Sequence, residues 1–246
     1  MINSLKCFCY RLLCFWLQSK AVSLGGFISL ILFFCYKSDN GNHILWFFSG
    51  KLAEFIFLIA IGFIVNFIFY IFQTYIPEYY RKKRAMGIIL KRIERISSCI
   101  IYHISNLKQV YLPSHNGNQY TKNDLAFIQK SIDLTNNSHV INANSNINGI
   151  KYLTIKQIMN IHFIEIENSI SAIYSNFSYF VPLDIAELLE KISFSLYYIN
   201  IKKIINWKAF SNTPFQECSD SFLYDYYEIA KELEKVTQKY KKFYGL

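Results

Sequence analysis

Several motifs that would place this chain among enzymes or metalloproteins are missing from its 246 residues. It has no Walker loop, no GxGxxG, no GxSxG and no HExxH, which mark nucleotide sites, serine nucleophiles and zinc-dependent hydrolysis. It also lacks a CxxC pair, and Cys7 and Cys9 have neither the spacing nor the partner ligands of a zinc site. We therefore expect no catalytic residues, no metal and no cofactor, and we interpret the six cysteines as free thiols.

His162 and Glu165 come closest to a metal-binding pair. They stand three residues apart and would share one face of a helix, but Glu167 would point elsewhere. We interpret this group as structural or as part of the surface, and Glu187 with Glu190 as a solvated charged face. An enzyme on the cytoplasmic side of a membrane is one function hypothesis, which the lack of plausible catalytic residues disfavours. Loss of activity on mutating His162 or Glu165 alone, with folding intact, would support it.

A cleavable secretory signal is not indicated, because no small-x-small site follows the first apolar run, residues 21–36. Residues 52–72 form a stronger run, in which fifteen of twenty-one residues are Leu, Ile, Val or Phe. These residues favour insertion into a bilayer by about 5–9 kcal/mol, which outweighs the cost of Glu54 and Asn66. We expect a transmembrane hairpin over 21–76, with spans at about 21–38 and 50–73.

Basic residues flank these apolar runs on both sides. Segment 1–20 carries a net charge of +3, and segment 81–100 carries +6, from seven basic residues and one acid. By the positive-inside rule both termini should be cytoplasmic, which predicts a multi-pass membrane protein. Residues 1–20 should lie in the inner interface as an amphipathic segment.

The larger basic cluster has two possible partners. It should contact the anionic lipid of the inner leaflet, or alternatively the phosphates of a nucleic acid. No RNP, helix-turn-helix or zinc-finger pattern favours nucleic acid specifically. The residues concerned are Arg81, Lys82, Lys83, Arg84, Lys91, Arg92 and Arg95.

Strand-like alternation is absent, and the rest of the chain shows helical periodicity, so the predicted fold class is all-α. Residues 77–111 should form a basic juxtamembrane helix, kinked at Pro77, with a buried face of Met86, Ile89, Ile93, Ile96, Ile100 and Ile104. Residues 112–246 should form a cytoplasmic helical bundle. We expect capping boxes at Thr121–Asp124 and Thr154–Gln157, a loop over 135–152, one helix over 183–206 and a last helix over about 217–243.

Few polar residues interrupt the second span, and three of them fall on one side of it. Gly62, Asn66 and Gln73 are spaced by four and seven residues, so they return to nearly the same angle around a helix. Lys51 and Glu54 stand three residues apart near the outer end. Polar groups at this depth seldom face lipid, so we expect them to face another helix or a water-filled path.

Two interpretations of these polar residues stay open. In the first, the hairpin packs on itself, with Asn66 bonding across to Ser29 while Gly25 or Gly26 allows close approach. In the second, several copies assemble as a homo-oligomer, so that the polar residues line a pore or disrupt the bilayer. The second interpretation requires oligomers, because one pair of helices cannot enclose water.

The hairpin 21–72 and the sequence IPEYYRKKR at 76–84 resemble the two-transmembrane effectors of bacterial anti-phage defence systems. Retron-associated effectors, which act beside a reverse transcriptase and its branched RNA–DNA product, look most similar. The resemblance implies an abortive-infection effector of the bacterial inner membrane that perturbs or permeabilises this membrane on activation. It also implies restraint by a cytoplasmic partner complex, such as the reverse transcriptase with its RNA–DNA.

A membrane-anchored scaffold or receptor is the alternative function. Its helical domain would dock a protein or ribonucleoprotein partner without opening the membrane. Expression of residues 1–100 alone separates the two hypotheses, because only an effector should be toxic through this part of the chain.

Overall fold

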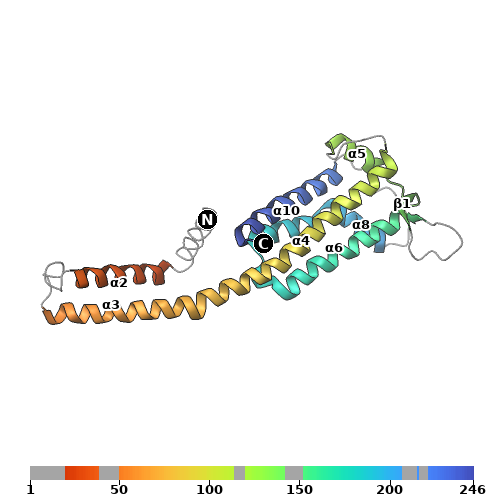
Figure 1. Ribbon diagram of the computed structural model, residues 1–246. Helices are drawn as coiled ribbons and strands as arrows, with labels where there is room; N and C mark the ends of the chain where they lie inside the picture. The colour runs from red at the N-terminus through yellow and green to blue at the C-terminus, as the bar shows by residue number, and fades with distance from the viewer. Residues whose placement is uncertain (1–19, 39–49, 114–119, 142–151, 207–214, 216–220) are drawn as a thin grey trace. The chain divides into compact units, whose positions relative to one another are not determined.

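The computed structural model describes residues 20–38, 50–113, 120–141, 152–206, 215 and 221–246 (Figure 1). The described chain is mostly helical, as predicted. It divides into two compact units, Met1–Lys82 and Lys83–Leu246, here called unit 1 and unit 2. The amphipathic segment predicted over 1–20 lies outside the described residues except for Lys20, and so does most of the turn between the predicted spans.

Unit 1 contains two antiparallel helices, α2 (Lys20–Ser38) and α3 (Gly50–Tyr70). Gly26 of α2 faces Phe67 of α3, and further along α2 the Phe33 ring stacks on Phe57 with centroids 5.7 Å apart. A Cβ atom on Gly26 would lie 2.9 Å from the Phe67 ring, whereas one on Gly25 would meet nothing within 4 Å. The close approach expected at one of these two glycines therefore occurs at Gly26.

The helix that starts with α3 does not stop at its end. A π-helical turn, η1 (Ile71–Tyr75), follows, and α4 (Ile76–Tyr111) continues the chain. In η1 the Ile76 N–H donates to the Ile71 carbonyl, five residues back. The sequence predicted a kink at Pro77, whose ring clashes with the carbonyl four residues earlier and which lacks an N–H. The structure places the wider π turn immediately before this proline, and the helix runs on.

Unit 2 is built around the part of α4 from Lys83 onward. Its predicted apolar face is confirmed, since all six side chains are fully buried: Met86, Ile89, Ile93, Ile96, Ile100 and Ile104. The surrounding helices are α5 (Lys122–Ser131), α6 (Ile155–Phe177), α7 (Leu183–Phe194), α8 (Leu196–Asn206) and α10 (Phe222–Tyr244). Figure 1 shows α4, α6 and α10 running alongside one another.

Local sequence signals explain where two of these helices begin. Both predicted capping boxes are confirmed: Thr121 caps α5 with Asp124, and Thr154 caps α6 with Gln157. In each box the threonine hydroxyl accepts from the backbone of the third helical residue, whose side chain accepts from the threonine N–H.

Two predictions about unit 2 were wrong in detail. The single helix expected over 183–206 is two helices, because Ser195 is extended and its Oγ accepts from the Tyr198 N–H at the start of α8. The loop expected over 135–152 contains strand β1 (Asn137–Ile141), which pairs antiparallel with β2 (Tyr152–Thr154). Strands of five and three residues are too short to show alternation in an Asn-rich sequence.

Candidate functional site

The polar residues predicted to share one side of the second span fall on α3 and η1. Gly62, Asn66 and Gln73 are all exposed. The opposite side of α3 packs on α2, because Ala60 is only 1% exposed and Phe67 covers Gly26. At about 100° per residue, Asn66 lies about 120° around the helix from Ala60, and Gly62 lies about 160° from it. The polar side of α3 therefore points away from α2.

This geometry corrects the expectation that Asn66 bonds across to Ser29. Ser29 is buried, at 5% exposure, whereas Asn66 is exposed on the far side of α3, and no hydrogen bond joins them. Lys51 and Glu54 are also exposed, near the start of α3, and no ion pair joins them among the described residues. Packing within the described pair of helices leaves the polar side chains of α3 without a role.

The continuous helical stretch from Glu54 to Tyr111 contains a segment that is long and apolar enough to cross a membrane. Only 6% of that apolar segment is buried in the structure. The apolar part of α2, Leu24–Phe34, is shorter. Within the residues described, one helix thus meets the length and composition of a membrane span.

The predicted basic cluster divides between the two units. Arg81 and Lys82 belong to unit 1, and the other five belong to unit 2. Arg84, Lys91 and Arg95 form an exposed stripe along α4, on the side opposite the buried isoleucines. Lys82, Lys83 and Arg92 are half-buried.

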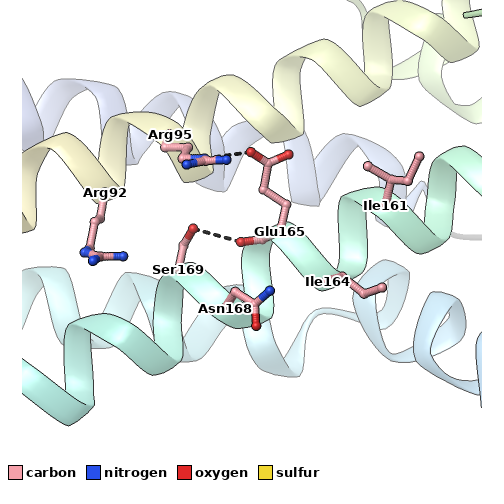
Figure 2. A pocket seen from close by; sticks show the side chains of 7 residues that line it. All are labelled: Arg92, Arg95, Ile161, Ile164, Glu165, Asn168 and Ser169. Carbon is pink, nitrogen blue, oxygen red and sulfur yellow. Dashed lines mark hydrogen bonds and ion pairs between the residues drawn. The ribbon is translucent and has the colours of Figure 1, made fainter. Parts of the chain in front are cut away.

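The last two residues of the basic cluster line a shallow groove between α4 and α6, with a volume of about 480 Å³ (Figure 2). Arg95 is committed to an ion pair, because its Nε donates to Glu165 Oε1 at 2.7 Å. The Nε atom of Arg92 is buried and has no hydrogen-bond partner within the described residues. The remaining lining comes from α6: Ile161, Ile164, Glu165, Asn168 and Ser169.

A buried polar network extends inward from this groove. Glu165 Oε2 accepts from the Cys99 thiol at 3.5 Å, and Cys99 Sγ lies 3.3 Å from His162 Nδ1. The other ring nitrogen of His162 lies 3.0 Å from the Tyr226 hydroxyl. Four side chains from α4, α6 and α10 are thereby joined into one chain of contacts.

A second histidine completes the network. His103 stacks on His162, with ring centroids 4.3 Å apart and planes inclined by 15°. Its Nε2 lies 2.6 Å from the Tyr197 hydroxyl, while its Nδ1 is buried without a partner among the described residues. The two imidazoles are only 1% and 3% exposed.

The network is electrically neutral apart from the ion pair at the groove. Burial lowers the pKa of His103 to about 3 and holds the pKa of His162 well below its usual 6.5, so both rings are uncharged at neutral pH. Burial, followed by the nearby Glu165 charge, raises the pKa of the Cys99 thiol to about 12. The thiol is therefore protonated, and its contact with His162 is a hydrogen bond rather than the ion pair of an activated nucleophile.

From the sequence Cys99 was interpreted only as a free thiol, and His103 was given no role. The sequence does contain two pairs of polar residues, each on one face of a helix: Cys99 and His103 are four residues apart, and His162 and Glu165 are three residues apart. The sequence does not indicate that α4 packs against α6. In the described residues no three His, Cys, Asp or Glu side chains gather as metal ligands would.

Comparison of the chain with protein-family models, with curated proteins and with solved structures found no match.

Proposed function

We propose that this chain is an inner-membrane effector whose copies associate through the polar side of α3 and permeabilise the bilayer when activated. The observation that carries the proposal is the exposure of Asn66 on the side of α3 that faces away from α2. In a bilayer that side chain would meet hydrocarbon unless another helix covers it. Asn side chains in apolar helices form interhelical hydrogen bonds of about 1–2 kcal/mol in model peptides, so self-association supplies the missing partner.

The dimensions of unit 1 support two spans. The 21 residues of α3 reach about 31 Å, close to the ~30 Å hydrocarbon core of a bilayer. The 19 residues of α2 reach about 28 Å, with Leu24–Phe34 as its apolar part and Lys20 and Lys37 near its two ends, where lysines of a span can reach the interface. The apolar surface of both helices is largely exposed, as lipid contact requires. Basic residues stand on both flanks, which supports cytoplasmic termini and contact of Arg81–Arg84 with anionic lipid.

The biological setting follows from the resemblance to two-transmembrane anti-phage effectors. In that setting the protein acts in abortive infection, and unit 2 is the regulated part. A cytoplasmic partner such as a reverse transcriptase with its RNA–DNA would hold unit 2 until infection. Protection of a bacterial culture against phage by the chain with its genomic neighbours, lost in the Asn66→Leu variant, tests this setting.

The direct test of the effector proposal is membrane potential, measured with a voltage-sensitive dye in bacteria induced to express the full chain. We expect wild-type protein to depolarise cells within minutes and Asn66→Leu to leave them polarised. Ile68→Leu is the matched control, because Ile68 is an exposed apolar residue two positions further along the same helix. Depolarisation that persists in Asn66→Leu would exclude the polar side of α3 as its cause.

A membrane-anchored scaffold is the second candidate. The observation that favours it is the break between α7 and α8, where Phe194 and Leu196 are 70% and 55% exposed on either side of Ser195. Exposed apolar groups of this size suit a protein partner. Cells that stay polarised with wild-type protein, together with a partner captured by the full chain and lost in Phe194→Ser, would favour this function over the effector.

A further inference from the structure

The turn between α6 and α7 carries the two most exposed large apolar side chains in the described part of the chain. Tyr179 is 79% exposed and Leu183 is 75% exposed. They stand on either side of Pro182, in the short segment formed by η2 (Ser178–Phe180) and the first residue of α7. Soluble surfaces rarely present such groups together, so the turn has the character of an interaction surface.

Contacts place this turn at the same end of unit 2 as the beginning of its part of α4. Asp184, next to Leu183, accepts from the Tyr240 hydroxyl at 2.8 Å and from Lys239 Nζ at 3.3 Å, which ties α7 to the last turns of α10. The last turns of α10 in turn reach α4, because a Cβ atom on Gly87 would lie 3.8 Å from the Leu246 side chain. Three helices therefore contribute to one end of the unit.

The charges at this end are predominantly positive. Arg84 and Lys242 are exposed and Lys83 is half-buried. Two nearby carboxylates are neutralised by lysines of α10, in the pairs Asp184–Lys239 and Glu94–Lys241. A third, Glu187, lies one turn along α7 from Leu183, is exposed and forms no ion pair in the described residues, so the cations still outnumber the unpaired acids. Exposed apolar groups beside unneutralised cations are the combination that binds the interface of an anionic bilayer.

We infer that this end of unit 2 docks on the surface of an anionic bilayer, with Tyr179 and Leu183 entering the interfacial region beside the lipid headgroups. Tyrosine suits this position, because its ring is apolar and its hydroxyl remains in contact with water and headgroups. The inference rests on the proposed function, since Lys83 directly follows Lys82 in the chain and the preceding helix is the one we propose to span the membrane. It adds a second, peripheral membrane contact made by the helical unit itself.

The test uses the full chain reconstituted into vesicles, with one environment-sensitive fluorescent amino acid incorporated at a time. Position 179 reports the docking surface, and position 127 is the matched control, because Phe127 is also an exposed aromatic residue, at 53%. It lies on α5, which contacts the start of α10 through the bond from the Leu223 N–H to Gln129 Oε1. The 23 residues of α10 separate that end from Tyr244 by about 34 Å. Position 63, in α3, reports the span.

Quenching by doxyl-labelled lipid is then compared in phosphatidylcholine vesicles with and without one quarter phosphatidylglycerol. With the anionic lipid, we expect quenching at 179 to exceed that at 127 at least threefold, and to fall at least twofold when phosphatidylglycerol is omitted. Leu183→Asp should halve quenching at 179 while leaving helicity unchanged, since Leu183 is exposed at the first position of α7, where the helix dipole favours an acid.

The outcomes separate this inference from the proposed function. Equal quenching at 179 and 127 with strong quenching at 63 overturns the docking surface and keeps the span. Absence of quenching at 63 overturns the span itself. Strong quenching at 179 that does not depend on phosphatidylglycerol overturns the role assigned to the cations.

Discussion

The Tyr197 hydroxyl makes the hydrogen bond of the buried His103 ring, whose other ring nitrogen has no partner in the described chain. Tyr197→Phe should therefore leave a buried imidazole without any hydrogen bond and destabilise unit 2 by about 1–3 kcal/mol. Thermal unfolding in detergent, followed by circular dichroism, measures this loss. Tyr102→Phe, at a side chain that is 61% exposed, is the control and should change little. If the Tyr197→Phe protein unfolds at the same temperature as the wild type, the contact contributes no net stability.

The histidine pair also predicts how stability responds to acid. The folded-state pKa of His103 is lowered to about 3, while an unfolded histidine titrates at about 6.5. The unfolded state therefore takes up protons first as the pH falls below about 6.5, so stability is complete above that pH and is lost progressively toward pH 3. His103→Gln should reduce the dependence of melting temperature on pH between about 6.5 and 4.5, and His162 should account for part of what remains.

At the scale of elements, the contact between α2 and α3 depends on one glycine of an adjacent pair. Gly26→Leu places a side chain where the Phe67 ring lies, 2.9 Å from the new Cβ atom, whereas Gly25→Leu has open space. We expect Gly26→Leu to reduce disulfide formation between cysteines introduced at 33 and 57 at least fivefold, in a chain whose other cysteines are serine. Gly25→Leu should not reduce it. Equal cross-linking in both variants would show that the two helices tolerate a wider separation.

Some features of these elements could be predicted from the sequence, and others could not. The buried face of α4 and the two capping boxes were predictable because each depends on residues within one or two turns of one another. The break at Ser195 was not, since a serine hydroxyl competes for a backbone N–H only when the neighbouring helices favour the bend. The Cys99–His162 contact joins residues 63 positions apart, and no local pattern determines which helices meet. The polar side of α3 was visible from spacing alone, but its direction away from α2 was not.

At the scale of the whole molecule, the part of α4 from Lys83 onward lies in the core of unit 2. Its six fully buried apolar side chains contribute about 1.5–3 kcal/mol each, or about 9–18 kcal/mol together, which is comparable to the 5–15 kcal/mol net stability of an ordinary domain. A chain of residues 83–246 should therefore fold as a helical monomer, and a chain of 112–246 should not. Circular dichroism and gel filtration of the two fragments compare them directly. A folded, monomeric 112–246 fragment would contradict the central position of α4.

The π turn sets the direction in which side chains after it point around the helix axis, relative to side chains before it. A π turn holds one more residue than the α-helical turn it replaces, so deleting a single residue within 71–75 would restore an ordinary α-helix. Side chains after the deletion would then keep nearly the same azimuth relative to those before it, because the π turn already absorbs the extra residue. The same deletion within the α-helical part of α3 would instead rotate every later side chain by about 100° relative to Asn66. A one-residue deletion should therefore be better tolerated within 71–75 than at any other place between Asn66 and Arg81.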